Sequence, residues 1–168
     1  MTRPLPSAVF VLALVLGGCD KPAATPPPQE VSDASTAQFC GMSLAEHAGP
    51  KGQIFVRDQA APLWFASVRD TIAFLRLPEM RKNVAAVYVN DMARATDWAH
   101  PEVGAWVDAR RAVYVIDSRR RSGMDTQEAV PFGDAAAARR FAATYGGHVV
   151  PLADIPDSYI LTDQGAGS

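Results

Sequence analysis

The part of the chain that can fold, residues 39–161, contains one order of secondary-structure elements twice. The first copy begins with strand sequence at residues 53–57 and 62–66, bounded by turn-forming residues. A helix follows from Ser67, because apolar residues recur at helical spacing after a capping pair. Residues 84–89 are apolar on both faces, which predicts a buried strand at the end of this copy.

The second copy repeats this order with little residue identity to the first. Strand sequence occurs at residues 106–108 and 112–117, and residues 129–132 parallel the second strand of the first copy. Asp134 is placed to cap an alanine-rich helix, and residues 149–152 supply the last strand. The sequence therefore predicts an α+β fold made of two small, similar ββαβ-like halves.

Chain length determines how the two copies combine. Each has about 50 residues and would be marginally stable alone, so we expect the halves to pack together. The predicted boundaries are residues 39–93 for the first half, 94–105 for a connection and 106–161 for the second half. Residues 162–168 are expected to form a disordered tail.

The N-terminal residues have the pattern of a lipoprotein signal peptide, predicted to span residues 1–18. Their apolar run is well short of the ~20 residues that cross a bilayer, and small residues separate it from Cys19, as in a lipobox. We therefore expect Cys19 to be acylated and to anchor the protein to the periplasmic side of a membrane. Asp20 resembles the signal that retains such lipoproteins in the inner membrane.

Residues 19–38 are rich in Pro, Ala, Ser, Thr and Gln and contain almost no large apolar side chain. Such a composition cannot bury enough surface to fold, so we predict a disordered, semi-extended tether. The formal net charge is −2, and loss of Arg3 with the signal peptide leaves 15 basic against 18 acidic residues, or −3. This balance argues against nucleic acid as a partner.

Cys40 is the residue that most needs an explanation. Acylation of Cys19 would leave it as the one free thiol in an oxidising compartment, which is open to three explanations: burial, intermolecular pairing or metal ligation. Met42 follows two positions later, across Gly41, so a thiol and a thioether can face one point. Copper(I) prefers such a pair of soft donors. The alternative is that Cys40 and Met42 simply pack into a small core.

The remaining thioether and imidazole side chains differ in their local sequence. Met124 lies between Gly123 and Asp125 in a polar loop, where a thioether has little to pack against, and His47 stands in a turn close to Cys40. We therefore add Met124 and His47 to the ligand candidates. The other side chains of these types fit packing or hydrogen-bonded positions better: Met80, Met92, His100 and His148.

Patterns for other chemistry are missing from the sequence. It has no paired Cys/His spacing for zinc, no C-x-x-C, no G-x-S-x-G and no phosphate-binding glycine loop, so we do not expect an enzyme. A thiol-based enzyme that depends on Cys40 is the weaker rival. The three arginines at residues 119–121 form either a solvated loop or a docking surface for an acidic partner beside Met124.

Several short motifs, taken together and in order, resemble the NosL family of copper-binding lipoproteins, which are encoded with nitrous oxide reductase. The resemblance runs from about Cys40 to Leu161 and includes the lipobox. The motifs are Phe39-Cys40-Gly41-Met42, Glu46-His47, Gly49-Pro50-Lys51-Gly52-Gln53-Ile54, Tyr88-Val89-Asn90-Asp91-Met92, Gly123-Met124, Glu128-Ala129-Val130-Pro131-Phe132 and Ala153-Asp154-Ile155.

This resemblance implies a periplasmic copper(I) chaperone that delivers metal for the copper-sulfide centre of nitrous oxide reductase, together with a membrane transporter complex. It implies Cys40, Met42 and Met124 as sulfur ligands, with His47 as a further ligand. The chain has Ser122 where the family usually has the first glycine of a pair. We expect the Cys40 loop and the Met124 loop to meet between the halves and share one copper(I). The alternative function is a lipoprotein adaptor that scaffolds a periplasmic complex without carrying metal.

Overall fold

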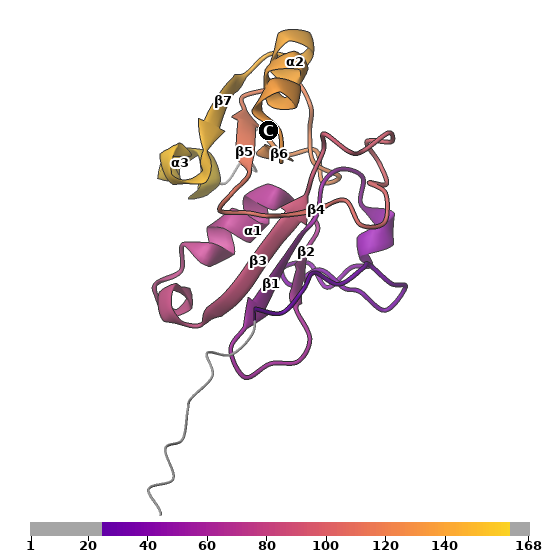
Figure 1. Ribbon diagram of the computed structural model, residues 1–168. Helices are drawn as coiled ribbons and strands as arrows, with labels where there is room; N and C mark the ends of the chain where they lie inside the picture. Colours follow the sequence, from indigo (N-terminus) through magenta and orange to yellow (C-terminus); the bar gives the residue numbers. More distant parts are fainter. Residues whose placement is uncertain (1–24, 162–168) are drawn as a thin grey trace, which may run out of the picture.

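The computed structural model describes residues 25–161 and contains two antiparallel sheets, which Figure 1 shows one above the other. The strand order is β2-β1-β3-β4 in the larger sheet and β6-β5-β7 in the smaller one. Cys19 and the rest of the predicted signal peptide lie outside the described residues, as does the predicted tail at 162–168. Among the helices from residue 25 to residue 161, none is long and apolar enough to span a bilayer.

The first half follows the predicted order. Ser67 caps its helix, because the Ser67 side chain accepts a hydrogen bond from Asp70 N at 3.0 Å. Pro78 begins a short 3-10 helix directly after the α-helix ends. The elements are β1 (Gly52–Val56), β2 (Leu63–Phe65), α1 (Val68–Leu75), η2 (Pro78–Lys82) and β3 (Val84–Asn90).

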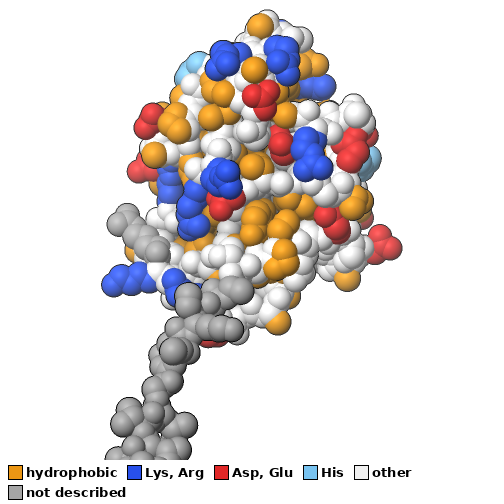
Figure 2. All heavy atoms as spheres, in the orientation of Figure 1, with side chains coloured by type: hydrophobic (Ala, Val, Ile, Leu, Met, Phe, Trp, Pro, Cys, Tyr) orange, Lys and Arg blue, Asp and Glu red, His pale blue; other side chains and the backbone are white. Residues whose placement is uncertain are grey.

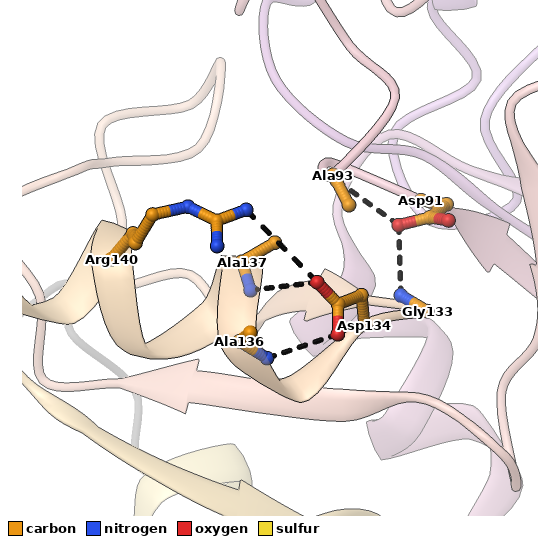
Figure 3. A network of polar contacts seen from close by, with 7 residues as sticks. All are labelled: Asp91, Ala93, Gly133, Asp134, Ala136, Ala137 and Arg140. Carbon is orange, nitrogen blue, oxygen red and sulfur yellow. Dashed lines mark hydrogen bonds and ion pairs between the residues drawn. The ribbon is translucent and has the colours of Figure 1, made fainter.

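The second half repeats the topology of the first, since β6-β5-β7 has the same order as β2-β1-β3. Asp134 caps α2 by accepting hydrogen bonds from Ala136 N and Ala137 N, both at 3.0 Å (Figure 3). The elements are β5 (Val113–Ile116), β6 (Val130–Phe132), α2 (Ala135–Tyr145) and β7 (His148–Pro151). The predicted α+β fold with two similar ββαβ-like halves is thus confirmed.

Strand β4 (Trp106–Asp108) lies in a different half from the one that the sequence predicts. It pairs antiparallel with β3, with Val107 opposite Val89, and so forms the edge of the first sheet. The sequence shows that these residues can form a strand, but it does not show which strand they pair with. The boundary between the sheets therefore lies after Asp108 rather than at residue 106.

The folded part also begins earlier than residue 39. Pro26 O accepts a hydrogen bond from Tyr88 Oη at 2.8 Å, and the main chain of Gln29 exchanges two hydrogen bonds of 2.8 and 2.9 Å with the side-chain amide of Gln53. Gln53 is fully buried, so its amide needs such partners. Residues 25–38 of the predicted tether are held by polar contacts, which composition does not reveal.

Two short elements at the C-terminal end were not predicted, namely η3 (Leu152–Asp154) and α3 (Asp157–Leu161). They return the chain to the first half, where Tyr159 O accepts a hydrogen bond from Arg69 Nε at 3.1 Å. Arg76 binds Ile155 O at 2.5 Å and forms an ion pair with Asp157. The second half therefore ends against α1.

One hydrophobic core joins the two halves, which confirms that they pack together. Apolar side chains of β1, β3 and α1 contact Tyr114 and Ile116 of β5 in a single cluster. Its buried members are Ile54, Phe65, Val68, Ile72, Val87, Val89, Ala109, Ala112, Tyr114, Ile116, Ala129, Ile155 and Ile160. A smaller cluster lies between α2 and its own sheet.

Two buried carboxyl groups make hydrogen bonds between the halves in opposite directions. Glu128 of the second half accepts hydrogen bonds at the start of α1 from Val68 N (3.4 Å) and Arg69 N (3.0 Å). Asp91 of the first half accepts one from Gly133 N (2.8 Å), directly before the cap of α2 (Figure 3). Each half thus provides an acceptor for free backbone N–H groups of the other.

Figure 2 shows positive and negative side chains interspersed on the visible face of the molecule. They do not gather into one charged field there, in agreement with the small net charge of −2. Long-range attraction of a strongly charged partner is therefore not a feature of this face.

Candidate metal site

Cys40 lies at the tip of a short hairpin. Ala37 N donates to Met42 O at 2.9 Å, and Gly41 N donates to Ala37 O at 2.8 Å, which closes the loop. Gly41 has a φ of +68°, a conformation that L side chains rarely adopt, so a glycine suits the turn between the two sulfur residues. The thiol of Cys40 is free and exposed, and the Met42 side chain is 47% exposed. Neither is packed into a core.

The hairpin is attached to the first half through the two residues that precede Cys40. Gln38 N donates to Trp64 O in β2 at 2.7 Å. The ring of Phe39 makes an edge contact with Phe65 at 5.6 Å and lies 6.1 Å from the ring of Phe74 in α1. These contacts fix the position of the loop tip, although the loop itself is exposed.

His47 is close to Cys40 in space. The Cys40 Sγ and His47 Nε2 atoms are 3.8 Å apart, within hydrogen-bonding distance for sulfur. A 3-10 turn, η1 (Leu44–Glu46), connects the hairpin to His47, and the fully buried Leu44 anchors this turn. His47 is buried to 5% exposure, so its imidazole presents one nitrogen to an exposed thiol. Cys40 and His47 are only seven positions apart in the sequence, and the hairpin and the turn between them bring the two side chains together.

Asp70, in the first turn of α1, lies near the imidazole. Burial raises the pKa of Asp70, while the Ser67 hydrogen bond and the charges of Arg69 and His47 act in the opposite direction. His47 therefore has the Cys40 thiol at hydrogen-bonding distance and the Asp70 carboxyl group close enough to interact with it electrostatically.

The Met124 loop packs directly against the residues after His47. A Cβ on Gly123 would lie 2.6 Å from Ala48 N and 2.7 Å from Ala48 O, so the two backbones are as close as a glycine allows. Ser122 closes this loop, because its N donates to Thr126 O at 3.0 Å and its Oγ accepts from Met124 N at 3.3 Å. Met124 is 37% exposed. The Met124 loop thus meets the segment that follows His47 at the backbone.

The remaining methionine and histidine side chains have other surroundings. Met92 packs against the smaller core cluster, and Met80 lines a groove between η2 and α3. His148 Nε2 lies 3.6 Å from Asp117 Oδ2, and His100 lines a small cavity beside Trp106. Among the described residues, no three His, Cys, Asp or Glu side chains form a metal-binding group. A metal ion at Cys40 therefore depends on thioether ligands.

The arginines at 119–121 do not all lie in solvent. Arg119 N and Nη2 donate to Tyr145 O (2.9 Å) and Thr144 O (2.6 Å) at the end of α2. Arg120 lies between the rings of Trp98 and Tyr145, with its Cζ 4.7 and 4.8 Å from their centroids. The sequence does not predict that Arg120 contacts Trp98 and Tyr145, because the three residues come from separate segments. A docking surface for an acidic partner would thus consist of the exposed Arg119 and Arg121, of which Arg119 is also hydrogen-bonded to the end of α2.

Two ionisable side chains close in sequence to the loops of the site, Lys51 and Glu128, are buried. Burial raises the pKa of Glu128 to about 8, although hydrogen bonds from Arg69 N, Ala129 N and Val68 N lower it. Burial also lowers the pKa of Lys51 to about 8, against the opposing charge of Glu128. The Lys51 Nζ donates to Gly49 O at 2.6 Å, two residues after His47. Burial therefore disfavours the charged forms of both Glu128 and Lys51 in this part of the molecule.

Comparison with known proteins points to one family. A family model described as NosL matches residues 28–160. The chain is 44% identical over 142 residues to the copper-binding lipoprotein NosL of Achromobacter cycloclastes, covering 84% of this chain and 74% of that protein. It is 29% identical over 133 residues to the protein of the same description from Stutzerimonas stutzeri, covering 79% and 68%. The crystal structure of the copper chaperone NosL from Shewanella denitrificans superimposes with a TM-score of 0.73 at 30% identity, covering 79% and 99%.

Proposed function

The chain belongs to the NosL family, and from this premise we propose that it is a copper(I) chaperone that delivers copper for the copper-sulfide centre of nitrous oxide reductase, a step in the maturation of a denitrification enzyme. It acts in the periplasm with a membrane transporter complex. Acylated Cys19 anchors it, and Asp20 favours the inner membrane. The description of its relatives as copper-binding lipoproteins supports the anchor and the metal.

The observation that carries this proposal is the position of Cys40. Its thiol is exposed at a loop tip, 3.8 Å from His47 Nε2, while the loop of Met124 packs against Ala48. A thiolate with thioether and imidazole donors suits copper(I) better than zinc or a hard cation. Cys40 supplies the strong bond, and Met42, Met124 and His47 complete the shell.

The exposure of the sulfur residues suits delivery rather than storage. Met42 and Met124 are 47% and 37% exposed, so a partner can approach the ion from outside and replace one ligand at a time. Thioethers carry no proton, whereas the thiol releases one when it binds metal. Copper(I) affinity should therefore fall as the pH drops, because protons compete with the metal for the sulfur.

Copper(I) stoichiometry tests the proposal. Native mass spectrometry of an anaerobically loaded, soluble form that lacks residues 1–19 should show one copper per chain. Cys40 is the one cysteine of this form, because the sequence has two. The loaded protein should transfer its copper to the metal-free reductase. A chain that binds no copper, but still captures the transporter complex in the presence of a copper(I) chelator, would be the adaptor instead.

The close packing of Gly123 on Ala48 gives a further prediction. Gly123→Ala should lower copper(I) affinity about tenfold, or about 1.4 kcal/mol, because the added Cβ displaces the Met124 loop from the His47 loop. Competition with the chelator bicinchoninate measures this change. Gly104→Ala is the control for added strain, since Gly104 lies in another loop, where a Cβ meets nothing within 4 Å but the φ of +78° disfavours alanine; it should lower stability without changing copper(I) affinity. Equal affinity in Gly123→Ala and the parent protein would show that the approach of the two loops does not matter for binding.

A further inference from the structure

Arg120 is held in an unusual environment for a cation. Its guanidinium lies over the rings of both Trp98 and Tyr145, at 4.7 and 4.8 Å from their centroids. Within the part of the chain that the structure describes, its Nε is buried without a hydrogen-bond partner, and none of the ion pairs involves it. The aromatic faces are therefore what compensates the charge in this position.

The two rings belong to rigid surroundings. Trp98 stacks on Phe141 of α2, with centroids 6.2 Å apart and planes 17° apart, and Phe141 in turn contacts Tyr145 at 4.7 Å. Arg119, the preceding residue, is hydrogen-bonded to Tyr145 O. The base of the Met124 loop is thus fixed to α2 and to the segment between β3 and β4 that contains Trp98.

Trp98 also contacts the other ligand loop. Its carbonyl oxygen accepts a hydrogen bond from Gly49 N at 3.1 Å, and a Cβ on Gly49 would meet the Trp98 ring at 3.6 Å. Gly49 follows His47 by two residues, and Arg120 precedes Met124 by four. Trp98 therefore connects the segment of His47 with the segment of Met124. It contacts the first through Gly49 and the second through Arg120.

We propose that Arg120 is a positioning residue for the metal site, because its place between Trp98 and Tyr145 holds the Met124 loop against the His47 loop. The thioether of Met124 then faces the ion bound by Cys40. This inference rests on the proposed function, since it assigns a role toward the same copper(I). It does not make Arg120 a ligand.

A double-mutant cycle on copper(I) affinity tests the coupling. Arg120→Gln, which removes the guanidinium and its charge without adding a sulfur donor, should lower the affinity 10- to 100-fold, as loss of an outer-shell partner does. In a Met124→Leu background the same change should alter affinity less than about twofold. Arg120→Lys should restore part of the loss, because the cation remains. Equal losses in both backgrounds would overturn the proposal.

Controls separate positioning from a purely structural role. Arg121→Gln changes the exposed neighbour and should leave the affinity unchanged in both backgrounds. X-ray absorption of the copper(I) form of Arg120→Gln should show one sulfur neighbour fewer, whereas a lower melting temperature with unchanged copper coordination would contradict the inference. If Arg120→Gln does not fold, Tyr145→Leu removes one ring without changing either loop and should give the same pattern. If the protein without substitutions binds no copper(I), the proposed function itself is wrong.

Discussion

Cys40→Ser should lower copper(I) affinity by about a thousandfold or more, equivalent to about 4 kcal/mol. Cys40 is the one thiol of the soluble form, and a serine hydroxyl is a hard, weak donor for copper(I). The remaining imidazole and thioethers are neutral, so the variant also loses the only anionic ligand of the proposed shell. Competition with bicinchoninate under anaerobic conditions measures the change.

This loss of affinity should occur without loss of fold. Cys40 is exposed at a loop tip, and surface substitutions usually change the free energy of unfolding by less than about 0.5 kcal/mol. Chemical denaturation of the metal-free parent and variant should therefore coincide. Met80→Leu is a matched sulfur control, because Met80 lines a groove away from the Cys40 hairpin. Parent-like affinity in Cys40→Ser would remove the thiol from the site and leave the chaperone proposal without its strong ligand.

The same variant distinguishes the thiol-based rival. The Cys40–His47 pair at 3.8 Å has the composition of a nucleophile with a base, and Asp70 lies near the imidazole. Such a pair predicts turnover that needs Cys40 but neither Met42 nor Met124. Relatives that are copper-binding lipoproteins favour metal ligation. Measurable turnover retained in Met42→Leu and Met124→Leu, yet lost in Cys40→Ser, would favour the enzyme.

The elements of both halves could be predicted because their signals are local. Ser67 and Asp134 mark helix starts, and the alternating or continuous apolar runs mark strands within a few residues. The identical order of elements then predicts the repeated topology, since short loops leave few ways to pair successive strands. Pairing across a longer connection is not local, which is why the place of β4 beside β3 could not be predicted.

The polar contacts of the N-terminal segment were also beyond local reasoning. Residues 25–38 contain almost no large apolar side chain, yet Glu30 accepts hydrogen bonds from Gly104 N at 3.0 Å and Trp106 Nε1 at 3.2 Å. Composition measures the ability to bury apolar surface and does not show specific hydrogen bonds to distant residues. The short α3 was missed for a similar reason, because its contacts with α1 come from the other half of the chain.

The candidate site divides in the same way. His47 follows Cys40 closely enough for one hairpin and one turn to bring them together, so nearness in sequence was a sufficient signal. The approach of the Met124 loop needed the family resemblance, because Met124 lies 82 positions after Met42 in the sequence. Arg120 carried no signal, since its aromatic partners come from the connection and from α2.

The largest expected effect on stability belongs to Glu128. Glu128→Ala should lower the free energy of unfolding by about 3 kcal/mol or more, because it leaves three buried backbone N–H groups, those of Val68, Arg69 and Ala129, without acceptors. The two halves would also lose a contact at the start of α1. Asp134→Ala, which removes the exposed cap of α2, should cost only about 1 kcal/mol. Urea denaturation compares the two variants, and equal losses would contradict a special role for Glu128.

The pH dependence of stability tests the state of this carboxyl group. Its pKa is raised from 4.5 to about 8 by burial, so the folded chain holds a proton in this range that the unfolded chain has released. The parent protein should therefore lose up to ~1.4 kcal/mol per pH unit as the pH rises from about 4.5 to 8. Lys51, with its pKa lowered from 10.5 to about 8, gives the opposite slope between those two values. Glu128→Gln should remove the first slope and keep the second. Urea denaturation at several pH values from 5 to 8 measures both slopes. If the free energy of unfolding depends on pH in the same way in Glu128→Gln and in the parent, the predicted proton uptake is wrong. The three N–H donors would then keep Glu128 ionised in the folded chain.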